Sequence, residues 1–144
     1  FCYDYTLKTF AYLYNADVTP RIISSQVRHI DFMPTILDML NIPINTSFER
    51  LDGKSLMPII NGQNVSEEFA FSETGNPLNE NAPPKAPNTK SIRSSKWKLI
   101  HNEHDNTMEL YDLKNDPNEE NNLIGKNSEI EKEFSKELLK YTDN

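Results

Sequence analysis

The residues best suited to chemistry in this sequence are one cysteine and three histidines, and they are widely separated. Cys2 is the only cysteine, so neither an intramolecular disulfide nor a cysteine-based zinc site can form. His29 and Asp31 lie two positions apart at the start of a predicted helix, where their side chains diverge. His101 and His104 fall in a polar segment between predicted strands. A catalytic divalent cation needs at least three converging ligands, so the pattern predicts structural or solvated histidines.

Nucleophilic catalysis also lacks a recognisable arrangement. Cys2 is close to the first residue, where we expect a mobile thiol without an activating partner. The sequence contains no G-x-S-x-G, P-loop or H-E-x-x-H motif. We therefore predict that the chain has no catalytic residue and no metal ligand of its own.

The acidic residues near the C-terminus do not form a calcium loop. Asp112–Asp116 resembles the start of an EF-hand, but Pro117 and Leu123 stand where that loop requires Gly and Glu. Neighbouring acids such as Glu119 and Glu120 are predicted to be solvated surface carboxylates.

Composition limits the remaining possibilities. The 144 residues suffice for one domain, and 36% hydrophobic residues with a mean hydropathy of −0.69 predict a modest core. The net charge of −7 disfavours nucleic acid and anionic membrane surfaces as partners. The absence of an apolar run of about 18 residues argues against a transmembrane span. A start at Phe1 instead of Met suggests a processed product or an excised piece.

The first third of the chain predicts a strand followed by a helix. Thr9–Asn15 is rich in aromatic and β-favouring residues, and Arg21–Ser25 could form a short second strand. Asp31 is predicted to cap the helix by accepting a backbone N–H of the first turn. The helix then presents an apolar stripe of Met33, Ile36, Leu37 and Leu40, and Asn41 and Pro43 end it.

The rest of the chain predicts an antiparallel sheet and a final helix, an α+β arrangement. A helical turn at Ser55–Ile60 precedes the sheet, and a long loop, Gly75–Asn88, interrupts it. Short polar connections favour antiparallel pairing of four strands: Glu68–Ser72, Lys90–Arg93, Trp97–Asn102 and Met108–Leu113.

The final helix has a clear start signal and one apolar face. Ser128 and Glu131 are spaced as a capping box. The predicted buried face carries Ile130, Phe134, Leu138 and Tyr141.

Several segments, in order, resemble the C-terminal part of the sulfatase family, within the alkaline phosphatase superfamily. They are HIDFMPTI at His29–Ile36, DGKSLMPIING at Asp52–Gly62, FAFSE, SIRSSKWKLI at Ser91–Ile100 and ELYDLKNDPNEENNL at Glu109–Leu123. Each segment alone is weakly specific, but five in register are a strong signal. YDYTLKTF at Tyr3–Phe10 also looks like a family segment, with Lys8 where Arg is usual.

The resemblance implies a fold and an incomplete active site. It implies that residues 1–45 are the edge of an α/β catalytic domain, a strand plus a helix. Residues 46–144 would be the small C-terminal subdomain, with four antiparallel strands and a helix. The family's formylglycine nucleophile arises in a C-x-P-S-R motif, which Cys2 does not match. Formylglycine and calcium are thus expected in the full-length enzyme and not in this chain.

The resemblance also implies partners. The remainder of the catalytic domain should pack on this chain, whose uncovered strand and helix would otherwise favour self-association. The substrate would be a sulfated small molecule or glycan, contacted by Glu73, Asn76 and Arg93. Such enzymes are often periplasmic, extracellular or lysosomal, but nothing in this sequence decides its compartment.

Three functions stay open. The first is the C-terminal part of a sulfuric ester hydrolase, inactive in isolation. The second is the tail of a phosphonate or phosphodiester hydrolase of the same superfamily. The third is a freestanding, non-catalytic binding module.

Overall fold

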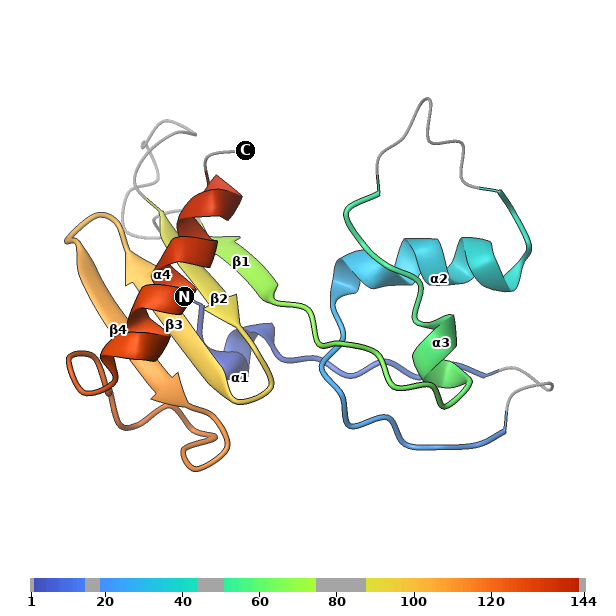
Figure 1. Ribbon diagram of the computed structural model, residues 1–144, viewed down its shortest axis with the longest axis horizontal. Helices are drawn as coiled ribbons and strands as arrows, with labels where there is room; N and C mark the ends of the chain where they lie inside the picture. Colours follow the sequence, from blue (N-terminus) through green and yellow to red (C-terminus); the bar gives the residue numbers. More distant parts are fainter. Residues whose placement is uncertain (1, 15–18, 44–50, 75–87, 143–144) are drawn as a thin grey trace. The chain divides into compact units, whose positions relative to one another are not determined.

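The computed structural model describes residues 2–14, 19–43, 51–74 and 88–142 (Figure 1). Backbone contacts divide the chain into two compact units. Unit 1 combines Phe1–Phe10 with Phe69–Asn144, and unit 2 is Ala11–Glu68. These boundaries differ from the predicted division at residues 45 and 46, because the N-terminal residues pack with the sheet. No helix in the described ranges is long and apolar enough to cross a membrane.

Unit 1 contains the predicted four-stranded antiparallel sheet, with strand order β1-β2-β3-β4 (Figure 1). The first strand begins two residues later than predicted, at Ala70, which pairs with Arg93, the last residue of the second strand. The strands are β1 (Ala70–Thr74), β2 (Thr89–Arg93), β3 (Trp97–Asn102) and β4 (Thr107–Asp112).

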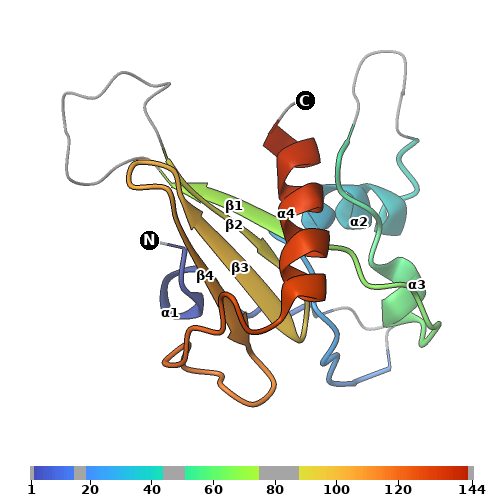
Figure 2. The same ribbon diagram turned by 60° about the vertical axis from the view of Figure 1, so that its left-hand side comes forward.

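One face of the sheet packs against the final helix, α4 (Ser128–Thr142), which lies across the strands (Figure 2). Phe134 contacts Phe69 edge to face, and Tyr141 stacks on Phe71 with ring centroids 4.4 Å apart. The predicted α+β class and the apolar face of the helix are therefore confirmed. The buried core of this face consists of Ile92, Leu99, Leu110, Phe134 and Leu138.

The start of α4 differs in one detail from the predicted capping box. Ser128 is already the first helical residue. The carboxylate of Glu131 accepts hydrogen bonds from the backbone N–H groups of Asn127 and Gly125, at 3.2 and 2.8 Å. Glu131 thus accepts hydrogen bonds from backbone N–H groups at the start of the helix, as predicted. These N–H groups belong to residues before Ser128 and not to Ser128 itself.

Unit 2 is mainly helical and irregular. It contains α2 (Phe32–Met39), preceded by a 3-10 turn, η1 (His29–Asp31), and the short α3 (Met57–Ile60). The strands predicted at Thr9–Asn15 and Arg21–Ser25 are wrong for every described residue among them; Asn15 lies outside the described ranges. A strand requires a hydrogen-bonded neighbour, and the sheet contains only β1 to β4.

The apolar stripe of α2 exists but faces solvent. Met33, Ile36 and Leu40 are 58%, 50% and 62% exposed, whereas Pro34 and Thr35 are buried. The Thr35 hydroxyl accepts a hydrogen bond from the backbone N–H of Leu56. The helix therefore packs within its unit through Pro34 and Thr35, whereas three of the four stripe residues stay exposed and Leu37 is half-buried.

Candidate functional site

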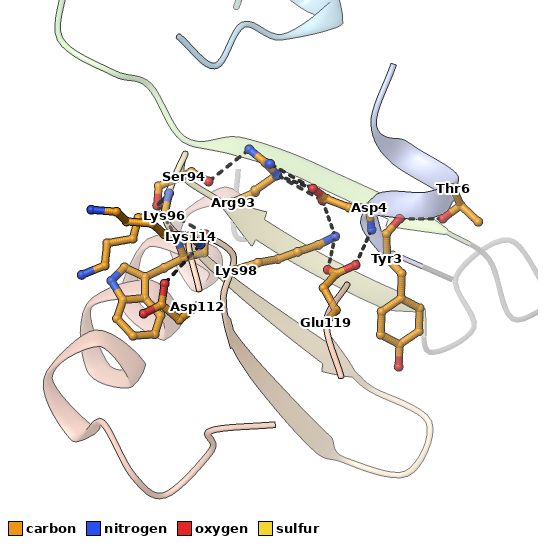
Figure 3. A network of polar contacts seen from close by, with 11 residues as sticks. Tyr3, Asp4, Thr6, Arg93, Ser94, Lys96, Lys98, Asp112, Lys114 and Glu119 are labelled. Atoms are coloured by element: carbon orange, nitrogen blue, oxygen red, sulfur yellow. Dashed lines mark hydrogen bonds and ion pairs between the residues drawn. The ribbon is translucent and has the colours of Figure 1, made fainter. Parts of the chain in front are cut away.

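The second face of the sheet carries charged side chains beside a small apolar core, and the N-terminal residues cover it. We call Cys2–Leu7 the strap; it includes the single-turn helix α1 (Asp4–Leu7). Because side chains alternate along a strand, Arg93 and Lys98, which pair across β2 and β3, share the face away from α4. Figure 3 shows Asp4 of the strap lying against both cations.

Four charged side chains form a closed network at this face. Asp4 Oδ2 accepts a hydrogen bond from Arg93 Nη2 at 2.9 Å, and Oδ1 accepts from Arg93 Nε at 3.1 Å. Asp4 Oδ1 also lies 2.9 Å from Lys98 Nζ. Lys98 Nζ is 2.7 Å from Glu119 Oε1, and Glu119 Oε2 accepts the backbone N–H of Asp4 at 2.6 Å. Two acids and two bases therefore neutralise one another in a largely buried network, with Arg93 at its more exposed end.

The network determines the protonation of Asp4. Burial by itself would raise the pKa of this carboxyl, but hydrogen bonds and charge from Arg93 and Lys98 outweigh burial and lower it below its usual 3.8. Asp4 is consequently ionised at neutral pH and acts as an electrostatic partner. A group so firmly ionised is a poor proton donor at that pH.

A second carboxylate, Glu109, holds the strap at Tyr3. Its Oε2 accepts hydrogen bonds from the hydroxyls of Tyr3 and Tyr111, at 2.7 and 2.6 Å. Burial and the hydrogen bond to Glu109 raise the pKa of Tyr3 to about 12, and the same causes raise the pKa of Tyr111. Both phenols therefore stay protonated and serve as hydrogen-bond donors.

Cys2 is buried, which corrects the prediction of a mobile thiol. Its side chain belongs to a small core with Ile100, Tyr111 and Leu113, and the residue is 1% exposed. Its Sγ lies 3.5 Å from the carbonyl oxygen of Thr89. Burial raises the pKa of the thiol, so Cys2 is an unreactive core residue.

The three predicted substrate-binding residues do not come together in the described structure. Glu73 pairs across the sheet with Lys90, on the α4 face, and its carboxylate accepts a hydrogen bond from the Asn88 side chain at 2.7 Å. Arg93 lies on the opposite face and binds Asp4. Asn76 lies outside the described residues.

The predicted metal candidates also remain apart. No three His, Cys, Asp or Glu side chains lie close enough to hold a metal ion within the part of the chain that the structure describes. His29 lies against the Phe32 ring, and His101 Nε2 is 3.2 Å from the Asn106 side-chain oxygen. These residues therefore do not fit the calcium that the family resemblance implies.

Asp31 in unit 2 stabilises a loop instead of capping α2 as predicted. Its carboxylate binds the Arg28 guanidinium, with 2.8 Å between Oδ1 and Nη2, and accepts the backbone N–H groups of Arg28 and Lys54. Burial alone would raise the pKa of Asp31, but these contacts lower it. The carboxylate bonds to Arg28, which precedes it in the chain, because residues 29–31 already form a 3-10 turn before the helix.

Sequence reasoning missed Lys98 and Glu119 as members of the network. A signal for Lys98 was present, since a lysine inside a predicted central strand, between Trp97 and Leu99, must find a partner if it is buried. Glu119 gave no such signal; it was predicted to be solvated but is buried.

Comparison with known proteins extends the resemblance to the whole chain. The family described as "N-sulphoglucosamine sulphohydrolase, C-terminal" matches residues 1–144. Choline-sulfatase of Rhizobium meliloti is 29% identical over 110 residues, which are 74% of this chain and 19% of that protein. N-acetylglucosamine-6-O-sulfatase of Bacteroides thetaiotaomicron is 29% identical over 113 residues, 77% of this chain and 19% of that protein. This chain thus spans about a fifth of these relatives.

Solved structures share the fold. One, a complex with its substrate D-glucosamine-2-N,6-O-disulfate, has 29% identity and a TM-score of 0.62 over 79% of this chain and 24% of that chain. Phosphonate monoester hydrolase from Silicibacter pomeroyi has 23% identity and a TM-score of 0.55, over 77% of this chain and 24% of that chain. At that identity the hydrolase shows a common fold only. With the match across residues 1–144, the chain belongs to the sulfatase family, as its C-terminal portion.

Proposed function

We propose that this chain is the scaffold at the C-terminal end of a sulfuric ester hydrolase, and that it is inactive in isolation. The observation that carries the proposal is the closed network of Asp4, Arg93, Lys98 and Glu119. Its charges bind one another and hold the strap to the sheet. Within the described residues no three His, Cys, Asp or Glu side chains are grouped to hold a metal ion, which supports a scaffold role for this part of the enzyme.

In this proposal the partner of the chain is the remainder of the catalytic domain. Unit 2 supports it, because Ile60 is the only buried Leu, Ile or Val among its described residues. A unit with so small a core needs a partner surface to become stable. The remainder would also supply the formylglycine and calcium that the family resemblance implies. The exposed residues that such a partner would cover include Tyr12, Tyr14, Ile22, Ile36 and Leu40.

The proposed substrate is a sulfated small molecule or glycan. The two curated relatives are named for choline and N-acetylglucosamine sulfates, so the class includes both kinds of alcohol. We propose that Glu73, near the end of β1, and Asn76, three residues further along the chain, contact the substrate. The third candidate, Arg93, is engaged with Asp4, which favours a structural role.

Activity measurements test the proposal directly. The purified chain is incubated with an aryl sulfate and an aryl phosphonate, alone and with the N-terminal part of a homologous sulfatase. We expect no turnover by the chain alone, and sulfate release only from the reassembled protein. Sulfate release by the chain alone, above a heat-treated control, would refute inactivity in isolation.

A phosphonate hydrolase is the second candidate, because the Silicibacter pomeroyi enzyme shares the fold. Preferential cleavage of the phosphonate by the reassembled protein would favour it. Binding of sulfated sugars by the chain alone, without turnover in either mixture, would instead favour a freestanding binding module.

A further inference from the structure

The contacts of Asp4 have the form of a bound ligand in a receptor site. Its two carboxylate oxygens meet Arg93 through Nε and Nη2, at 3.1 and 2.9 Å, which is the bidentate geometry of carboxylate recognition. A second cation, Lys98 Nζ, lies 2.9 Å from Oδ1. Both cations come from the sheet, and the anion comes from a segment that residues 11–68 separate from it.

We propose that Arg93 and Lys98 form an anion-binding socket on the sheet, and that Asp4 of the strap is its internal carboxylate ligand. Each cation of the socket also has a contact that does not involve the Asp4 side chain. Arg93 Nη1 donates to the carbonyl oxygen of Ser94 at 3.1 Å, and Lys98 is fixed by Glu119 at 2.7 Å. The side chain of Lys98 is fully buried. Because water is excluded there, the attraction between its ammonium group and a small anion is strong.

The charge of the socket selects the class of anion. Arg93 and Lys98 contribute two positive charges, and Glu119 contributes one negative charge beside Lys98. Without Asp4 the socket therefore has a net charge of +1, which one carboxylate neutralises. A doubly charged sulfate would bring a surplus negative charge next to Glu119. The socket is thus matched to monovalent carboxylates. It differs in this from a site that would bind the sulfate group of the proposed substrate.

The test is chemical rescue of an Asp4→Ala variant of the full chain. Removing the carboxylate should lower the melting temperature by several degrees and leave a space for a small anion. Acetate or formate should then raise the melting temperature, with a shift that grows as the logarithm of concentration above the dissociation constant. Chloride at equal ionic strength should have a smaller effect, and sulfate should not exceed acetate.

Three controls make the rescue specific. The unmodified chain should show no acetate shift beyond that of chloride, since Asp4 fills the socket. Asp4→Ala combined with Arg93→Gln should lose the rescue. Asp38→Ala removes a carboxylate that accepts a hydrogen bond from Ser55, and it should not be rescued.

Equal shifts of Asp4→Ala in acetate and chloride would overturn the proposal. A larger effect of sulfate would replace the carboxylate socket by a general oxyanion site and would also contradict it. If Asp4→Ala does not fold, Asp4→Ser is measured in the same salts, with the same outcomes. These measurements do not use turnover, so they can fail or succeed independently of the proposed sulfatase role.

Discussion

Lys98 and Glu119 form an ion pair that is almost completely withdrawn from water. Nζ of Lys98 lies 2.7 Å from Oε1 of Glu119, and their side chains are 0% and 2% exposed. Glu119 has a φ of +57°, in the left-handed region that side-chain-bearing residues rarely adopt. Its carboxylate also accepts the backbone N–H of Asp4. The ion pair therefore offsets the backbone strain at Glu119. The same carboxylate also holds the strap, through its hydrogen bond with Asp4.

Lys98→Met should strongly destabilise the chain. The substitution leaves the carboxylates of Asp4 and Glu119 facing each other without the buried cation between them. Breaking a buried pair by removing one partner typically costs about 3–5 kcal/mol. The free energy of unfolding from urea titration, followed by circular dichroism, measures the loss.

Lys140→Met is the matched control for that substitution. Lys140 pairs with Glu137 on α4, but the two side chains are 58% and 30% exposed, so the pair should contribute less than about 1 kcal/mol. Equal losses for the two variants would mean that burial does not strengthen the Lys98 pair.

Acid should weaken the chain through Asp4 and Asp31. Both carboxyls have a pKa below the usual 3.8 when folded, so the unfolded chain binds more protons in that range. The stability that these two ionised carboxylates add to the folded chain is fully present at pH values above the ordinary pKa of 3.8. It is lost as the pH falls through the lower pKa values of the folded state. Thermal melts between neutral and acidic pH should show this decline. Asp4→Asn should show a shallower decline, and an unchanged slope would contradict the assignment.

The thiol of Cys2 should report on the strap. Because Cys2 is 1% exposed and burial raises its thiol pKa, a disulfide reagent should react with it slowly in the native chain. Asp4→Asn weakens the strap and should accelerate the reaction at least several-fold, whereas Asp38→Asn in unit 2 should not. Rapid labelling of the unmodified chain would show that the strap does not cover this face.

Gly53→Ala should disrupt unit 2. A Cβ at this position would overlap the carbonyl group of Ile30, which is backbone and cannot rotate away. Overpacking of this kind costs about 1–3 kcal/mol or more. Gly125→Ala is the control, since a Cβ there meets no atom within 4 Å, although its φ of +79° carries some strain. Urea titration should rank Gly53→Ala as the more damaging change.

The isolated chain should self-associate. Phe10, Tyr12, Tyr14 and Ile22 are each more than 80% exposed, and the apolar stripe of α2 adds to this surface. Light scattering over a concentration series should show a mass that rises with concentration. Ile36→Lys and Leu40→Lys together should reduce it; a concentration-independent monomer would contradict the prediction.

The sequence by itself determined the local elements of unit 1 and the family. Strand alternation and short polar connections place β2, β3 and β4 to within one residue of their predicted bounds. Periodicity gave the buried face of α4, because Phe134 and Leu138 lie one turn apart. These features depend on residues close in the chain, so a single sequence contains the information. The in-order segments gave the sulfatase resemblance for the same reason.

Tertiary structure alone decided which charges meet and which apolar faces are covered. Asp4 joins Arg93 and Lys98 across 89 and 94 positions of sequence, and no local pattern encodes such a contact. Thr9–Tyr14 has the composition of a strand but is not one, because β-structure needs a neighbouring strand as well as propensity. The stripe of α2 has the period of a buried helix face, yet burial requires a second surface that local sequence does not specify.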